Sequence, residues 1–222
     1  MKLLTFSFGL AAALGAACAV SGNAEEHGRA EYTFKSGRVY HLLKSLPLDA
    51  ASYQPETAAL VTAGIPEKYG PEEWAAVVLT NEIHQHVGIY NVIGAKMGVR
   101  AREILEAPAR AVNVTVETGC KPPVSCLIDG LQVALGSTFA QDLIHAPACE
   151  TPRAAAVFEY GNRKIRLSLN PEAESQVAEW IAKAVQECGN LTPAYFERIE
   201  EYSYRVWATF DRNAIFKVET MP

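Results

Sequence analysis

The chain has 222 residues, of which 49% are hydrophobic, and its 20 Lys and Arg against 25 Asp and Glu give a formal net charge of −5. This length is enough for one sizeable core, or for a domain with an appendage. A mildly acidic chain without a basic stripe is a poor candidate for nucleic-acid binding, so no nucleic-acid partner is expected.

The first residues have the pattern of a secretory signal peptide. One lysine precedes an apolar run of small residues, which ends at the polar stretch "SGNAEE". Gly22 and Ala24 stand at the small positions before a predicted cut after residue 24. We therefore expect residues 1–24 to be removed, the protein to be secreted or periplasmic, and no stable membrane span to remain. A lipoprotein anchored through Cys18 is the less favoured alternative, because Gly15 stands where such signals usually carry leucine.

Four cysteines remain after this cut, namely Cys120, Cys126, Cys149 and Cys188. An even number of cysteines in an oxidising compartment favours two structural disulfides. The alternative is a metal site, and the two interpretations compete, because a thiolate ligand cannot also be half of a disulfide.

Proline and glycine punctuation divides the rest of the chain. Residues 25–69 are expected to be an irregular lead-in with one or two short helices. The elements predicted after it are helices at about 71–83, 88–106, 126–135, 171–188 and 193–208, a strand near 112–116, a hairpin within 154–169 and a last extended piece near 214–219. This order favours an α+β domain over a doubly wound sheet. The aromatic residues of the last two helices are expected to lie in the core or on a homodimer surface.

Two histidines, His84 and His86, come directly before the glycine-containing helix "VGIYNVIGAKMG". Residues two apart do not share a helix face, but they can converge at the entry to a helix. They are therefore either exposed residues at a helix start or ligands of a metal ion. In the helix itself, Gly94, Gly98 and Ala101 form one smooth face, which is typical of close approach by another backbone or a ligand.

The stretch "PPVSCLIDG" adds a thiol and a carboxylate. If Ser125 caps the following helix, Cys126 is its first residue, where the helix dipole favours the thiolate. Asp129 shares its face, and can bind a metal, orient a ligating histidine or transfer a proton. Two imidazoles and one thiolate leave a zinc-like ion one open position. The alternative for Cys126 is a disulfide, most simply with Cys120.

These two stretches, "HQHVGIYNVIGAKMGVRA" and "PPVSCLIDGLQVALGST", resemble the FmdE family, which is named for the FmdE subunit of formylmethanofuran dehydrogenase. The resemblance covers about residues 70–169. It implies an α+β domain with a mixed β-sheet packed against helices. It divides the chain into an FmdE-like metal-binding domain at 70–170 and a helical C-terminal extension at 171–222, packed on the same domain.

The resemblance also implies a site for zinc or another divalent transition metal. Carried over by position, its ligands are His84, His86 and Cys126, and its pocket contains Asp129, Gln132 and Thr138. Cys120 and His145 are possible additional ligands, and a disulfide between Cys149 and Cys188 then accounts for the other thiols. Many members carry a Gly-Lys-Gly run after the threonine, whereas this chain has "STFAQDLIHA".

Three functions follow from these alternatives. The first is an exported metal-binding protein, an accessory or carrier without turnover, whose partners are the metal ion and, as a further alternative, a small-molecule ligand. The second is a metal-dependent enzyme with Asp129 as the proton-transfer group. The third is a disulfide-stabilised binding domain without a metal.

Overall fold

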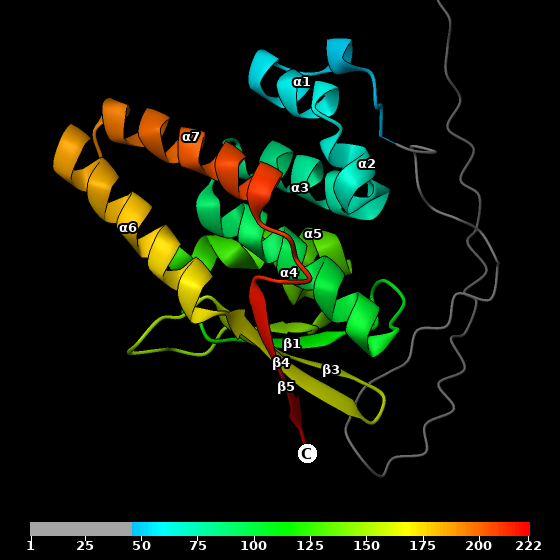
Figure 1. Ribbon diagram of the computed structural model, residues 1–222. Helices are drawn as coiled ribbons and strands as arrows, with labels where there is room; N and C mark the ends of the chain where they lie inside the picture. Colours follow the sequence, from blue (N-terminus) through cyan, green and yellow to red (C-terminus); the bar gives the residue numbers. More distant parts are fainter. Residues whose placement is uncertain (1–45) are drawn as a thin grey trace, which may run out of the picture. The chain divides into compact units, whose positions relative to one another are not determined.

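Seven α-helices and a five-stranded sheet make up residues 46–222, the part of the chain that the computed structural model describes (Figure 1). The predicted signal peptide, with Cys18, lies outside the described residues. The elements are η1 (Ala50–Ser52), α1 (Pro55–Thr62), α2 (Ile65–Tyr69), α3 (Pro71–His84), α4 (Ile89–Leu105), β1 (Asn113–Val116), η2 (Val124–Cys126), α5 (Leu127–Leu135), η3 (Phe139–Gln141), β2 (Ile144–His145), β3 (Ala155–Tyr160), β4 (Arg163–Leu169), α6 (Pro171–Cys188), α7 (Pro193–Thr209) and β5 (Phe216–Met221). Among these residues, no helix combines the length and apolar character that a membrane crossing needs.

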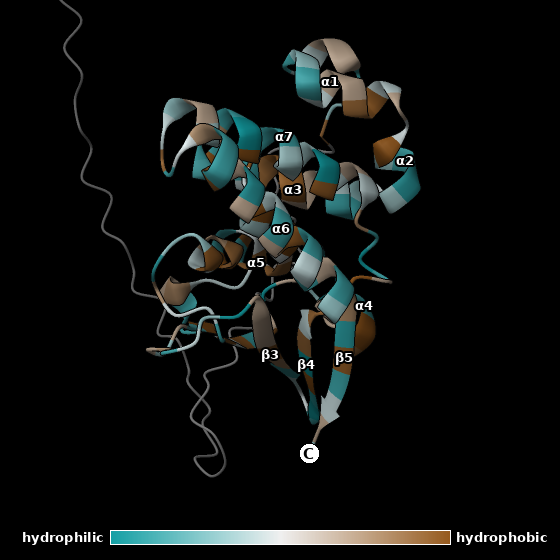
Figure 2. Cartoon of the chain, turned by 60° about the vertical axis from the view of Figure 1, so that its left-hand side comes forward, coloured by the Kyte–Doolittle hydropathy of each residue, from teal (hydrophilic) through white to brown (hydrophobic). Residues whose placement is uncertain are grey.

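The sheet is mixed, with the strand order β2-β1-β3-β4-β5. Strand β2 pairs parallel to β1, and the other neighbours pair antiparallel. Side chains alternate between faces along a strand, so Ile165, Leu167 and Leu169 of β4 are buried between the half-buried Lys164, Arg166 and Ser168. The same alternation of teal and brown is visible along β4 and β5 in Figure 2. The expected α+β class with a mixed sheet is confirmed.

Helix α4 is the centre of the molecule. It packs against α3, α5 and α7 and against strands β3 and β4, and most of its residues are buried. The small residues predicted to form a smooth face explain how it fits there. A Cβ built on Gly94 would overlap the carbonyl of Leu127, and one on Gly98 would lie 2.7 Å from the Cβ of Ala134. The close approach is therefore that of α5, and helix packing accounts for the glycines.

Prolines and capping side chains set the ends of the last two helices as the sequence predicted. Asn170 accepts a hydrogen bond from the backbone N–H of Ala173, and Thr192 accepts one from that of Tyr195. Helices that start with such caps keep their first backbone donors satisfied. The apolar face of α7 packs on α4 and α6, with Val206 and Trp207 buried. The predicted boundary after residue 170 remains a prediction.

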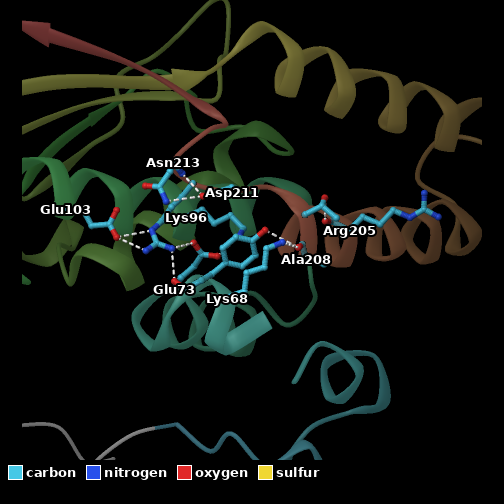
Figure 3. A network of polar contacts seen from close by, with 11 residues as sticks. Lys68, Glu73, Lys96, Glu103, Arg205, Ala208, Asp211 and Asn213 are labelled. Atoms are coloured by element: carbon cyan, nitrogen blue, oxygen red, sulfur yellow. Dashed lines mark hydrogen bonds and ion pairs between the residues drawn. The ribbon is translucent and has the colours of Figure 1, made fainter. Parts of the chain in front are cut away.

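A charge cluster within the helical layer ties together segments that are far apart in the sequence (Figure 3). Lys96 of α4 donates to a carboxylate oxygen of Glu73 on α3, and both side chains are fully buried. Arg212, in the segment between α7 and β5, donates to the second oxygen of Glu73 at 2.9 Å and to Glu103 at 2.7 Å. The ammonium of Lys96 lies 4.1 Å from the centre of the Tyr69 ring. Burial lowers the pKa of Lys96, and Glu73 opposes that shift.

On the other face of the sheet, Arg166 joins three strands. Its guanidinium donates to both oxygens of Glu117, at 2.6 and 2.7 Å, and to Glu219 at 2.7 Å. The hydrogen bonds from Arg166 lower the pKa of Glu117. A carboxylate whose folded-state pKa is below its unfolded value stabilises the fold above that unfolded value, and the stabilisation is lost as the pH falls through the folded pKa.

We therefore expect Glu117→Gln to lower the free energy of unfolding by about 1 kcal/mol at pH 7. The difference from the wild type should disappear as the pH falls below the usual range of a glutamate, because the wild-type carboxylate is then protonated too. Urea unfolding at several pH values measures this. Glu159→Gln is the matched control, since its contact with Lys164 is long, at 3.4 Å, and exposed. An equal loss at acidic and neutral pH would contradict the prediction.

Candidate metal site

The two histidines lie at the turn between α3 and α4. Helix α3 ends at His84, one residue beyond the predicted end at about residue 83. His84 is therefore the last residue of a helix. Gln85 follows in the left-handed conformation, with φ 64°. This reversal brings the rings of His84 and His86 together, with their centres 4.3 Å apart. The predicted convergence of the two side chains is thus achieved by a helix C-cap.

Asparagine side chains hold this turn in place. The N–H of Gly88 donates to Oδ1 of Asn91 at 2.9 Å. The amide nitrogen of Asn91 therefore faces the turn, where it donates to Oδ1 of Asn81 at 3.0 Å and to the carbonyl of His86 at 3.2 Å. Sequence reasoning did not identify Asn81 and Asn91. The signal that could have found Asn91 is its position three residues after the helix entry, where a polar side chain caps the turn.

Asp129 on α5 reaches back to the end of α3. Its Oδ2 lies 2.7 Å from Nδ1 of His84, which is 12% exposed. The other ring nitrogen of His84, Nε2, is buried and has no hydrogen-bond partner. A carboxylate on Nδ1 fixes the tautomer in which Nδ1 carries the proton and Nε2 presents a lone pair. Buried polar atoms without a partner are uncommon, and this one is the group that would bind a metal.

Cys126 takes a different position at the start of α5 from the one predicted. It is the N-cap of α5, after the short helix η2, and Ser125 makes no capping hydrogen bond. Burial raises the pKa of the Cys126 thiol, and the nearby Asp129 carboxylate raises it further. The expected lowering by a helix N-terminus is wrong, because the carboxylate and the loss of solvent oppose the thiolate. Loss of solvent lowers the pKa of His86, and His84 adds to that shift.

The close packing of α4 and α5 positions Asp129 beside His84. Gly94 contacts the carbonyl of Leu127, the residue directly after Cys126, and Gly130, directly after Asp129, contacts the backbone of Asn91 and Ala95. Cys126 directly precedes the helix that carries Asp129 and interacts electrostatically with its carboxylate. Within residues 46–222, however, no group of three or more His, Cys, Asp or Glu side chains is arranged as a ligand cluster.

The other predicted site residues lie elsewhere. Helix α5 is roughly 13 Å long, and Thr138 lies beyond its C-terminal end, whereas Cys126 directly precedes its start. The hydroxyl of Thr138 lies 3.4 Å from Oε1 of Gln141. Gln132 is half-buried one turn after Asp129. His145 lies on β2, 3.7 Å from Asp142, and Cys120 donates to the carbonyl of Ala146. Asp129 is thus the predicted pocket residue that bonds to His84.

The four cysteines among the described residues are unpaired in the structure, and the disulfide between Cys149 and Cys188 stays a prediction. Cys149 packs beside Gly119 at the end of the sheet. Cys188 ends α6, a helix of 18 residues that starts at the sheet and is therefore roughly 27 Å long. The two thiols belong to different parts of the fold, and sequence spacing alone could not reveal this.

Comparisons with known proteins bear on the family of the chain. Residues 83–214 match the model of a family described as "FmdE, Molybdenum formylmethanofuran dehydrogenase operon". A solved structure, that of an FmdE-like protein of the tungsten formylmethanofuran dehydrogenase type from Syntrophus aciditrophicus, is similar with a TM-score of 0.44 and 16% identity, over 67% of this chain and 71% of that chain. No curated protein matches. Since the family match spans more than half of the 222 residues, the chain belongs to the FmdE family.

Proposed function

We propose that this FmdE-family protein is exported and binds a divalent transition metal, zinc in the first instance, as an accessory or carrier protein. The observation that carries the proposal is the buried, unpartnered Nε2 of His84, whose Nδ1 is bonded to Asp129. Metal-binding histidines commonly have this arrangement, with one nitrogen on a carboxylate and the other on the ion. The family description refers to a metal-using enzyme's operon, which is compatible with such a site.

In this proposal His84, His86 and Cys126 hold the ion, and Asp129 orients His84. The carboxylate of Asp129 already fixes His84, the ring of His86 lies beside that of His84, and Cys126 would complete the set by moving toward them. The lowered pKa of His86 keeps its imidazole neutral and able to bind a cation near neutral pH. Two imidazoles and a thiolate suit zinc, and the bound ion would supply a Lewis-acidic open position. Export rests on the sequence of residues 1–24 alone.

The enzymatic alternative assigns proton transfer to Asp129. The 2.7 Å contact with His84 favours a positioning role instead, because that carboxylate oxygen is already engaged. The metal-free alternative needs all four cysteines paired, so a free-thiol count on the purified protein that finds Cys126 in a disulfide would favour it over the metal site.

Elemental analysis of the full chain, purified without chelating resin, tests the proposal. We expect about one zinc-like ion per chain. His84→Ala and Cys126→Ala should each weaken zinc binding by at least about 100-fold, and Asp129→Ala by about 10–100-fold, measured by competition with a chromogenic chelator. His145→Ala is the matched control and should bind as the wild type does. Circular dichroism checks that each variant keeps its fold.

Two results would contradict parts of the proposal separately. A fully loaded Cys126→Ala protein would remove Cys126 from the ligand set and leave the histidines. A wild-type protein that is isolated without metal and does not take up added zinc, cobalt or copper would overturn the metal-binding function itself.

A further inference from the structure

A hollow of about 350 Å³ opens at one end of the sheet, and none of the proposed metal ligands lines it. Its walls are residues 118–121, which follow β1, and Ala148, Cys149 and Pro152, which follow β2. Two of the described thiols, Cys120 and Cys149, therefore line the same cavity from different segments.

Sheet topology explains why these segments meet. Strands β1 and β2 are parallel, with Thr115 opposite His145. Parallel neighbours run about 4.8 Å apart and leave the sheet at the same edge. In the sequence, Cys120 lies five residues after Thr115, and Cys149 lies four residues after His145. The pairing register thus carries both cysteines out of the sheet side by side.

Glycine at position 119 allows the final approach. Its φ of +61° is in the left-handed region, and a Cβ built there would lie only 3.5 Å from the Cβ of Cys149. No side chain therefore separates Cys149 from the backbone next to Cys120. Cys149 thus lies against the residue that directly precedes Cys120 in the chain. A disulfide between the two cysteines requires a Cα separation of about 4.4–6.8 Å.

The two thiols differ in access. Cys120 is exposed and its Sγ donates to the carbonyl of Ala146 at 3.4 Å, whereas Cys149 is half-buried. No group of three metal-ligating side chains lies here or elsewhere in residues 46–222. An accessible thiol beside a sheltered one is the arrangement of an attacking and a resolving cysteine.

We propose that Cys120 and Cys149 are a dithiol pair that exchanges with small or protein-borne disulfides and closes into an intramolecular disulfide across this hollow. With glutathione disulfide as the oxidant, the Cys120 thiolate attacks one of its sulfurs, forms a mixed disulfide and releases one glutathione thiolate. The Cys149 thiolate then attacks Sγ of Cys120 and releases the second glutathione. Two protein thiols are oxidised, one glutathione disulfide is reduced to two glutathione thiols, and the two protein protons pass to these products.

The closed bond joins the segments after β1 and β2 and so fixes the short edge strand β2. It also leaves Cys126 and Cys188 reduced. This pairing differs from the Cys120–Cys126 bridge and from the Cys149–Cys188 bridge that was expected if Cys126 holds a metal, and it requires no metal.

The test uses the full chain, first reduced, then freed of reductant and incubated with glutathione disulfide. Mass spectrometry of the intact protein should record the loss of two hydrogen masses, and alkylation should then modify two fewer thiols than in the reduced protein. Trypsin does not cut between Lys121 and Pro122, so Cys120, Cys126 and Cys149 stay on the peptide 111–153 and Cys188 falls on another. The Cys126→Ser variant resolves which pair is formed, because only Cys120 and Cys149 then remain on that peptide.

We expect the internal bond in the wild type and in the Cys126→Ser and Cys188→Ser variants. Cys149→Ser should stop at the glutathione adduct of Cys120, and Cys120→Ser should form no internal bond. Oxidation should raise the Tm of the wild type by roughly 5–10 °C, and that of Cys120→Ser should not change. Glutathione adducts without an internal bond in the wild type, or an internal bond that persists in Cys149→Ser, would overturn the proposal.

Discussion

Replacing Glu73 by glutamine is expected to lower the free energy of unfolding by about 3–5 kcal/mol. Glu73 is fully buried and is the carboxylate shared by Lys96 and Arg212. The amide of the variant keeps the shape of the side chain but removes the negative charge, so the buried ammonium of Lys96 loses its compensating partner. Urea unfolding of the full chain at pH 7 measures the loss.

The double variant Glu73→Gln/Lys96→Met separates the charge from the packing. Methionine fills a similar volume without a charge, so it should restore at least about half of the stability lost in the single variant. A loss equal to the sum of the two single variants would contradict this account, and so would a cost below about 1 kcal/mol for Glu73→Gln alone.

The pH dependence of the single variant gives an independent test. Burial already lowers the pKa of Lys96 below its usual 10.5, and Glu73 opposes the shift. Without Glu73 the folded-state pKa should fall further, and the unfolded chain then binds more protons over the window up to about 10.5. Stability rises with pH wherever the unfolded state binds more protons. Below about pH 10.5 the stability of the variant should therefore increase with pH over a wider range than that of the wild type.

Replacing Gly130 by alanine is expected to cost about 3 kcal/mol, although alanine favours helix by about 1 kcal/mol relative to glycine. The added methyl group would overlap the carbonyl of Asn91 and the backbone nitrogen of Ala95. Both clashes are with backbone atoms of the buried helix α4, so they can be relieved only if α4 and α5 move apart. Because Asp129 precedes Gly130, the same movement should weaken zinc binding. Thermal unfolding and chelator competition measure the two effects.

Gly98→Ala is the matched control on the same helix interface. Its methyl group would lie 2.7 Å from the Cβ of Ala134, an obstacle on a side chain. We expect it to cost about 1 kcal/mol and expect the exchange Gly98→Ala/Ala134→Gly to recover most of that loss. If Gly98→Ala proved as costly as Gly130→Ala, the distinction between backbone and side-chain obstacles would be wrong.

Prolines at helix starts and residues typical of turns made much of the fold predictable from the sequence. Pro71, Pro171 and Pro193 stand at the first positions of the helices they were expected to start, and the two residues after Tyr160 turn the β3–β4 hairpin. These signals act through the backbone of neighbouring residues, so they can be identified in one dimension. The family resemblance, confirmed by the match over 83–214, supplied the mixed sheet.

Features that depend on distant residues could not be predicted in this way. Strand β2 has only two residues and exists because β1 offers it a partner. In the sequence, Glu73 is an ordinary acidic residue in the first turn of a helix. Only the fold shows that it pairs with Lys96 and Arg212. The protonation of Cys126 depends on burial and on Asp129, and not on its position at a helix start alone. For the candidate site, spacing brought the two histidines, Cys126 and Asp129 into consideration, but only the fold showed that Asp129 bonds to His84.

The charge cluster also has a consequence for the order in which the chain can fold during synthesis. Lys96 follows Glu73 by 23 residues, but Arg212 follows it by 139. A chain whose growth has not reached Arg212 lacks the partner of the second oxygen of Glu73. Domains fold as units, and contacts between distant residues form late. A ribosome-stalled chain ending before residue 212 should therefore be cut by protease within α3 and α4, and one extended beyond β5 should resist.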